Sequence, residues 1–557
     1  MKNNFNKTAL RFNRKKFVFI SLSTILIFQP SIAQVASREN LVSADWLNLN
    51  LKNAEVLIID ASPSQLYILK HIPGAINYDI FNYGPQNLPV SEIENSYQAL
   101  GISLGKKIVI YDQGGTFFAT RLFFALDYFG FPSKNLYILD GGISKWQEKG
   151  LTVTSEPATV PKKGSFKIGK LKNDIRADLS EFIEASGNPE NNSLVEALDP
   201  DWHFGSLNIF GRPGHVPYAI LLPIENFFNP DRTFKSTEEI NKIMTYLDID
   251  PGKNVYSHCG GGIAASVPFF AIKYLCGYTS VKLFPGSLLE WTADERELPL
   301  WTYDSPYLMR NTNWLQGWGG MMMRMYGMSH LSLIDVREAN LFRNGHLQYA
   351  LNVPPEVFRS NITNNLRITE ALGRAGVDAS TEAVVISGGG LTKEAALAFV
   401  MLEKLGQNKV SLYMGDADKW NQLGFNVIRD TNALDAKTLG QDLSGQTSNY
   451  PVNLYNNKII TECRVAQGLY PRVIIASGNE LPEQTLEGTV IHLPSTDLLN
   501  TDGTPKEAKN IWEILSKAGV PRFAEIVCYS DDPGEAAVTF FILKLMGFKD
   551  VKVLMNN

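Results

Sequence analysis

The stretch VYSHCGGGIA, residues 255–264, places one cysteine between an apolar run and three consecutive glycines. The residues before Cys259 favour a buried strand, and the apolar residues that follow the glycines favour a helix. A strand that turns through a glycine-rich loop into a helix is the building unit of a parallel α/β sheet. Ligands of such sheets bind beyond the carboxyl ends of the strands, so the stretch also predicts where the chemistry lies.

Similar stretches recur at intervals of about 130 residues, which is the size of a domain. Each copy has a β-branched run ending in an acidic turn, a later turn, and a second strand that enters a polar or glycine-rich loop. In three copies the later turn contains a histidine that we interpret as a turn residue: His71, His215 and His346. The sequence therefore predicts an α/β protein of four tandem domains, each a mostly parallel sheet flanked by helices. The predicted domains span residues 36–158, 170–310, 311–430 and 445–557.

The composition is that of a folded protein. The 557 residues are 44% hydrophobic and 20% charged, which excludes collagenous and disordered chains. The net charge of −5 lacks the basic excess of a nucleic-acid-binding surface, so no nucleic-acid partner is expected. Four cysteines are too few for a disulfide scaffold, and each thiol can be considered singly.

The first 33 residues have the pattern of a secretory signal peptide. A basic segment precedes the apolar run FVFISLSTILIF at residues 17–28, and Ser31 and Ala33 offer a cleavage site. The apolar run is short for a membrane span, although an uncleaved anchor is the alternative. We expect an exported protein, periplasmic or secreted, with no membrane span after removal of the signal.

Cys259 is the candidate nucleophile. The glycines that follow it allow successive backbone N–H groups to turn inward, and the predicted helix adds the positive end of its dipole. Both effects favour the thiolate, which is the nucleophilic form of cysteine. The alternative is a buried structural thiol, but three consecutive glycines destabilise a chain unless the backbone requires them. We therefore expect covalent catalysis through a sulfur intermediate.

The other three copies lack a thiol at this position. Cys259 lies 18 residues before Gly277, and Gly388 lies 18 before Gly406, so the spacing predicts glycine at the nucleophile's position in the third copy. The first copy has Asp112 and its neighbours there, and the cysteine of the fourth copy falls inside a strand. His258 is a further candidate because it adjoins Cys259, although neighbours in a strand face opposite sides.

The sequence resembles the rhodanese family of sulfurtransferases in the turn HIPGA at residues 71–75, in the loop at residues 259–264, and in the closing segments DGG at 140–142 with Trp146 and GS at 286–287 with Trp291. The resemblance implies that Cys259 accepts a sulfane sulfur from thiosulfate or 3-mercaptopyruvate, forms a persulfide, and passes the sulfur to cyanide or a thiol. It further implies that the first domain is inactive and closes over the second. The donor and the persulfide would lie against the loop amides of Gly260, Gly261, Gly262, Ile263 and Ala264.

The loop departs from the family pattern because it carries no charge. Many members that use thiosulfate have a cation in the loop, and the arginine expected after the acidic turn is Leu198 here. Arg212 is the nearest basic candidate for donor binding. No metal or organic cofactor is implied, because the sequence has no zinc-ligand pattern, phosphate loop or dinucleotide fingerprint.

Two other functions remain as alternatives. An exported sulfur-binding, relay or scaffold protein with little turnover would explain why three copies lack the nucleophile. In that case residues 311–557 would bind a protein acceptor. A phosphatase is disfavoured, because the loop has no arginine to bind phosphate through two hydrogen bonds.

Overall fold

A computed structural model describes residues 40–83, 88–159, 161–319, 323, 331–429, 450, 459–460, 468–481 and 488–555. The predicted signal peptide and Cys463 therefore lie outside the described residues. The described chain is an α/β protein with four sheets of parallel strands, and we call the parts around them the first to fourth units. Among the residues that the structure describes, no helix combines the length and apolar character needed to cross a bilayer.

The first unit is built on a five-stranded sheet in the order β1-β5-β4-β2-β3. Its strands are β1 (Leu41–Val42), β2 (Val56–Asp60), β3 (Ile76–Asn77), β4 (Lys107–Tyr111) and β5 (Leu136–Leu139). Its helices are α1 (Ala44–Asn50), α2 (Ser64–Leu69), α3 (Ile80–Tyr83), α4 (Val90–Ala99), α5 (Phe118–Tyr128) and α6 (Gly142–Glu148). The central strands are continuous apolar runs because helices bury both faces of the sheet.

The second unit has a four-stranded sheet in the order β7-β6-β8-β9. Its strands are β6 (Asn192–Glu196), β7 (Ala219–Leu221), β8 (Asn254–His258) and β9 (Val281–Leu283). Its helices are α7 (Leu179–Ser186), α8 (Pro200–His203), α9 (Thr237–Tyr246), α10 (Ser266–Phe270) and α11 (Ser287–Ala293). The chain continues from α10 through a π-helical turn at Ala271–Leu275, in which the hydrogen bonds span one residue more than in an α-helix.

The third unit has the sheet order β10-β15-β14-β11-β13. Its strands are β10 (Met309–Arg310), β11 (Leu331–Asp335), β13 (Ala350–Asn352), β14 (Glu382–Ile386) and β15 (Lys409–Tyr413), with a separate antiparallel pair β12 (His346–Leu347) and β16 (Val427–Ile428). Its helices are α12 (Thr312–Gly319), α14 (Ala339–Asn344), α15 (Pro355–Arg359), α16 (Asn365–Ala375) and α17 (Lys393–Leu405).

The fourth unit repeats this arrangement with the sheet order β17-β21-β20-β18-β19. Its strands are β17 (Ile459–Ile460), β18 (Arg472–Ala476), β19 (Thr489–His492), β20 (Glu525–Tyr529) and β21 (Val551–Leu554). Its described helices are α18 (Ala508–Lys517) and α19 (Pro533–Leu545).

The units pack in pairs through the helix that follows each loop. Helix α5 of the first unit lies against α10 of the second, where the rings of Phe123 and Phe270 have centroids 5.0 Å apart. Helix α17 of the third unit lies against α19 of the fourth, and the centroids of Phe399 and Phe541 are also 5.0 Å apart. One continuous apolar core therefore joins the members of each pair.

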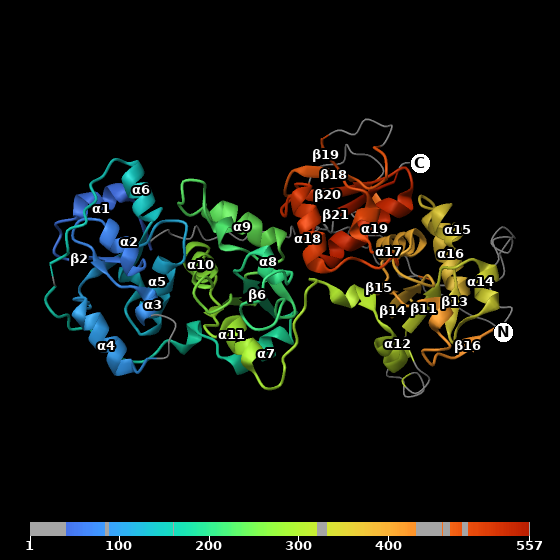
Figure 1. Cartoon of the computed structure of the whole chain (residues 1–557), viewed down its shortest axis with the longest axis horizontal. Helices are drawn as coiled ribbons and strands as arrows, with labels where there is room; N and C mark the ends of the chain where they lie inside the picture. Colours follow the sequence, from blue (N-terminus) through green and yellow to red (C-terminus); the bar gives the residue numbers. More distant parts are fainter. Residues whose placement is uncertain are drawn as a thin grey trace, which may run out of the picture.

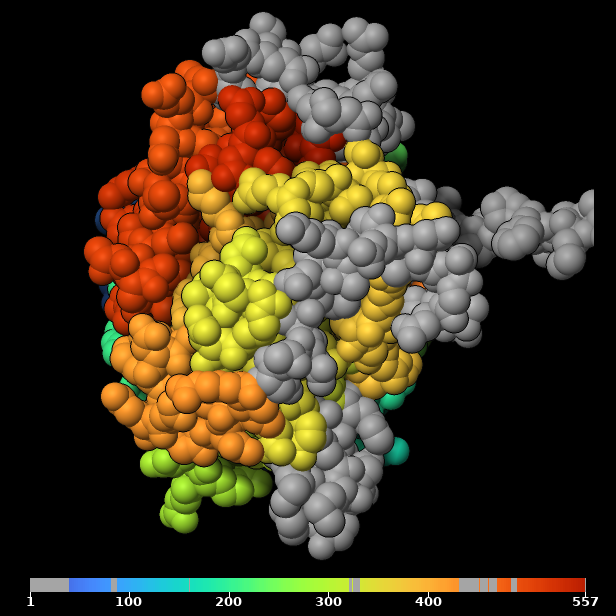
Figure 2. Space-filling view, turned by 90° about the vertical axis from the view of Figure 1, so that its right-hand side faces the viewer, coloured from blue at the N-terminus to red at the C-terminus, as the bar shows by residue number. Residues whose placement is uncertain are grey.

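The fourth unit also lies against the second, so the order of the units in space differs from their order in sequence (Figure 1). Tyr246 donates its hydroxyl to the carbonyl of Ala524 at 2.9 Å, and the rings of Phe204 and Trp512 stack with centroids 5.5 Å apart. Viewed from the right-hand side of Figure 1, the yellow and orange residues of the third unit adjoin the red residues of the fourth (Figure 2).

Candidate active site

Cys259 directly follows β8, a central strand of the second sheet. The thiol is buried, with 3% of the residue exposed, and belongs to the apolar core that the first and second units share. The backbone N–H of Gly262 donates to Sγ over 3.2 Å. The sulfur thus lies at the carboxyl end of the sheet, with a loop amide directed at it, as anion binding requires.

Helix α11 holds the loop in place. The N–H of Cys259 donates to Oγ of Ser287 at 3.0 Å, and the N–H groups of Leu288 and Leu289 donate to the carbonyls of Cys259 and Gly260 at 3.1 and 2.9 Å. Ser287 adopts a φ of 51°, which a non-glycine residue rarely adopts. The first turn of α11 therefore fixes the backbone on both sides of the sulfur.

Two of the loop glycines are required by their surroundings. A Cβ at Gly260 would overlap the ring of Phe210, which covers the loop from the segment before His215. Gly262 has a φ of +77°, and a Cβ there would overlap the backbone of Pro285. Ile263 and Ala264 pack at the edge of the core shared with the first unit. The glycines are therefore needed for close approach and for the left-handed backbone.

Neither basic candidate lies in the loop. His258 is fully buried and packs edge-on against Phe182, in the core on the opposite side of the sheet from Cys259. Burial lowers the pKa of His258 to about 4, so the ring is neutral near pH 7. Arg212 donates from Nη2 to the carbonyl of Leu298 at 2.6 Å, in the segment that closes the second unit.

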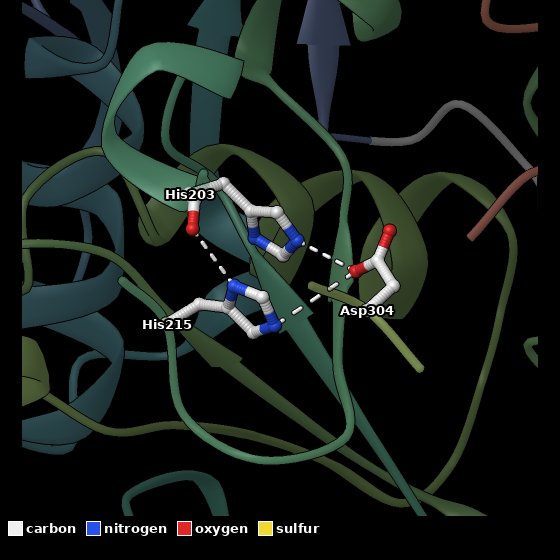
Figure 3. A group of neighbouring side chains, drawn as sticks. All are labelled: His203, His215 and Asp304. Atoms are coloured by element: carbon white, nitrogen blue, oxygen red, sulfur yellow. Dashed lines mark hydrogen bonds and ion pairs between the residues drawn. The ribbon is translucent and has the colours of Figure 1, made fainter. Parts of the chain in front are cut away.

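The sequence did not reveal a buried cluster of charged residues that includes His203, His215 and Asp304 (Figure 3). Glu196 and His203 of this cluster also act on the charge of His258. His203 bonds through Nδ1 to Glu196 and through Nε2 to Oδ1 of Asp304 at 2.6 Å. Burial alone would lower the pKa of His203, but the two carboxylates outweigh it and raise the pKa to about 9. The cluster is therefore a buried imidazolium held between two carboxylates.

His215 stacks on this imidazolium. Its ring is parallel to that of His203 within 1°, with centroids 3.6 Å apart, and its Nδ1 donates to the carbonyl of His203 at 2.8 Å. Burial and the charge of His203 lower the pKa of His215 to about 4. With Asp304 the two histidines offer three ligand atoms within 4.8 Å of one another. The fit to a metal is poor, because parallel rings direct their lone pairs side by side and His203 already uses both nitrogens.

The strand register identifies the residues that correspond to Cys259 in the other units. In the second unit, the last residue of β8, His258, pairs with the last residue of β6, Glu196, and the loop begins at the next residue, Cys259. The same pairing marks the start of the loop in the other three units. Tyr111 pairs with Asp60, Ile386 with Asp335 and Tyr529 with Ala476. The corresponding residues are therefore Asp112, Ser387 and Ser530.

This register corrects the prediction that Gly388 occupies the nucleophile's position in the third unit. Ser387 lies 19 residues before Gly406, whereas Cys259 lies 18 before Gly277, because α17 (Lys393–Leu405) is longer than the helical stretch at residues 266–275, so counting back by 18 residues gives a position one too late. Oγ of Ser387 donates to the carbonyl of Gly390 at 3.2 Å, three residues on, whereas Sγ of Cys259 accepts from the N–H of Gly262. The prediction that these units lack a thiol here is unaffected.

The sequence and fold were compared with those of known proteins. The sequence model of the Rhodanese-like domain matches residues 43–149 and 322–423, in the first and third units. A sulfur carrier protein of Thermus thermophilus is 30% identical over 272 residues, covering 46% of this chain and 94% of the relative. A mitochondrial thiosulfate/3-mercaptopyruvate sulfurtransferase of Arabidopsis thaliana is 26% identical, covering 49% of this chain and 81% of the relative. The crystal structure of a 3-mercaptopyruvate sulfotransferase from Escherichia coli aligns with 44% of this chain and 98% of that chain, at 26% identity and a TM-score of 0.41.

Proposed function

The chain belongs to the rhodanese family of sulfurtransferases, and we propose that its second unit transfers a sulfane sulfur through a persulfide on Cys259. The proposed donor is thiosulfate or 3-mercaptopyruvate, and the proposed acceptor is cyanide or a thiol. The observation that carries the proposal is the position of Cys259. It is the one thiol among the four corresponding residues, and the amide of Gly262 points at its sulfur.

Two half-reactions follow from this geometry. With thiosulfate, the thiolate of Cys259 attacks the outer sulfur, a new S–S bond forms, and the original S–S bond breaks to release sulfite with its electron pair. In the second step the acceptor, cyanide or a thiolate, attacks the outer sulfur of the persulfide. Cys259 then leaves as a thiolate, and the enzyme returns to its starting state.

The loop favours the anionic states of this cycle. Thiolate and persulfide both carry negative charge on sulfur, the amide of Gly262 donates to this sulfur, and residues 260–264 carry no side-chain charge. Because α11 holds the loop backbone, these dipoles need little reorganisation when the charge moves from one sulfur to the next.

Intact-mass spectrometry tests the proposal. Brief incubation of the protein with either donor should add about 32 Da, the mass of one sulfur atom, to the wild-type protein and nothing to Cys259→Ser. Cys276→Ser is the matched control, because burial raises the pKa of that thiol to about 12 and it lies outside the loop. A mass gain that persists in Cys259→Ser would refute the assignment.

A sulfur relay is a second candidate function, favoured by the absence of a thiol at Asp112, Ser387 and Ser530. Here the persulfide would form at the same rate but wait for a protein acceptor bound to the third and fourth units. Stoichiometric loading without steady-state turnover on cyanide would favour this function over a small-molecule enzyme. Export by the predicted signal at residues 1–33 is part of either proposal, and a mature N-terminus near Gln34 would support it.

A further inference from the structure

An arginine of the first unit lies on the helix that packs against the second. Arg121 lies on the first half of α5, the helix that packs against α10. The preceding residue, Thr120, bonds through Oγ1 to Oγ of Ser266 at 2.8 Å, in the first turn of α10. Arg121 is therefore held where the helix after the Cys259 loop begins.

Arg121 is buried but has no counter-ion. Only 7% of the residue is exposed, and Nε is fully buried without a hydrogen-bond partner. No side-chain hydrogen bond or ion pair joins Arg121 to any residue in the part of the chain that the structure describes, and its guanidinium carbon lies 5.4 Å from the ring centre of Phe124. Proteins rarely bury an unpaired charge, so a bound anion would supply the counter-charge and the hydrogen-bond acceptor that this guanidinium lacks.

The charge of this cation interacts with the nucleophile. Burial lowers the pKa of Arg121 to about 10, and Tyr97 and Cys259 are among the groups that act against this change. Arg121 thus stays charged near pH 7 and lies within electrostatic range of Cys259 across the interface. Arg176 adds a second positive charge close enough to lower the pKa of Arg121 further. Two neighbouring cations favour a bound anion.

We propose that Arg121 binds the anionic end of the sulfur donor, so that the first unit completes the active site of the second. The ligand class is a small oxyanion that carries a sulfane sulfur or a thiol, with a sulfonate or carboxylate group that accepts two hydrogen bonds from one guanidinium. This assignment rests on the proposed function of Cys259. It explains how an uncharged loop with Leu198 in place of the expected arginine still selects an anionic donor.

Alkylation of Cys259 tests the assignment without depending on the donor. Iodoacetate and iodoacetamide alkylate the same thiol, but only iodoacetate carries a carboxylate. In the full-length protein, the ratio of the iodoacetate rate to the iodoacetamide rate should fall about tenfold or more in Arg121→Gln, as expected for loss of hydrogen bonds to a charged group. Arg296→Gln is the matched control and should leave the ratio unchanged, because that arginine of the second unit is exposed and pairs with Asp294.

Arg121→Lys keeps the assignment testable if the glutamine variant does not fold. Lysine retains the charge but cannot make the paired hydrogen bonds, so the ratio should fall by a smaller factor and KM for thiosulfate should rise more than kcat falls. A ratio unchanged in both variants, or lowered equally by Arg296→Gln, would overturn the assignment. An Arg121-dependent ratio in a protein that never gains a sulfur atom would instead refute the proposed function and leave the anion site in place.

Discussion

Arg522 of the fourth unit donates from Nη2 to Oδ2 of Asp304 at 3.2 Å, while Oδ1 of Asp304 accepts the bond from His203. A single carboxylate thus joins a cation of the fourth unit to the imidazolium under the sheet that carries Cys259. Burial would raise the pKa of Asp304, but His203 and Arg522 hold it well below its ordinary value. The contact between the two halves of the chain is therefore ionic as well as apolar.

Arg522→Ala should lower the free energy of unfolding by about 2–4 kcal/mol, because it leaves Asp304 with one buried partner instead of two. Urea denaturation followed by tryptophan fluorescence measures the change. Lys517→Ala is the control: its ion pair with Glu513 is exposed on α18, so its effect should stay below about 0.5 kcal/mol. Equal effects of the two substitutions on the free energy of unfolding would show that the contact with Asp304 does not stabilise the protein.

The ring of His203 should remain protonated at about pH 8, because its pKa is raised to about 9. In the unfolded chain this ring loses its proton near pH 6.5, so its contribution to stability is complete below that pH and is lost as the pH rises to about 9. His215 and His258 have pKa values lowered to about 4, so their contribution is lost as the pH falls from 6.5 towards 4. Nitrogen-15 NMR of the imidazoles measures each proton directly, and a neutral His203 at pH 8 would contradict this prediction.

Gly260→Ala should abolish sulfur loading of Cys259, because the new methyl group overlaps the ring of Phe210 and displaces the loop. Combining it with Phe210→Ala should restore part of the loading, since the smaller side chain makes room. Mass spectrometry after brief incubation with donor measures all three variants. Full loading of Gly260→Ala alone would mean that the loop tolerates the displacement.

Ser387→Cys in a Cys259→Ser background should place a thiol where the strand register puts the nucleophile in the third unit. The new thiol should lie near Gly390, to whose carbonyl Ser387 donates at 3.2 Å, and it should react with iodoacetamide. Gly388→Cys is the matched comparison and should destabilise the loop, because Gly388 has a φ of +91° and a Cβ there would meet Arg337. If Gly388→Cys were stable and reactive while Ser387→Cys were inert, Gly388 and not Ser387 would correspond to Cys259.

The sequence predicted the parts of the molecule that depend on local pattern. The parallel strands, the loop at residues 259–264 and the opposite orientations of His258 and Cys259 follow from periodicity and glycine placement. The cluster around His203 could not be predicted, because Asp304 lies 101 residues further along the chain and outside any repeated motif. Arg121 was missed for a similar reason: nothing in a helix sequence indicates which unit it will face. The position of Ser387 was missed because the spacing to the next glycine depends on the length of the helix between them, which differs between the units.

The contact between Arg522 and Asp304 spans 218 residues of sequence, which makes the order of synthesis matter. When the second unit has left the ribosome, Asp304 still lacks Arg522 and Phe204 still lacks Trp512, and both partners appear only after almost the whole chain has been made. Domains generally fold as they emerge, from the N-terminus onward. The unit that carries Cys259 would therefore reach its full stability last, and a chain interrupted before residue 522 would carry the nucleophile in a weakened half.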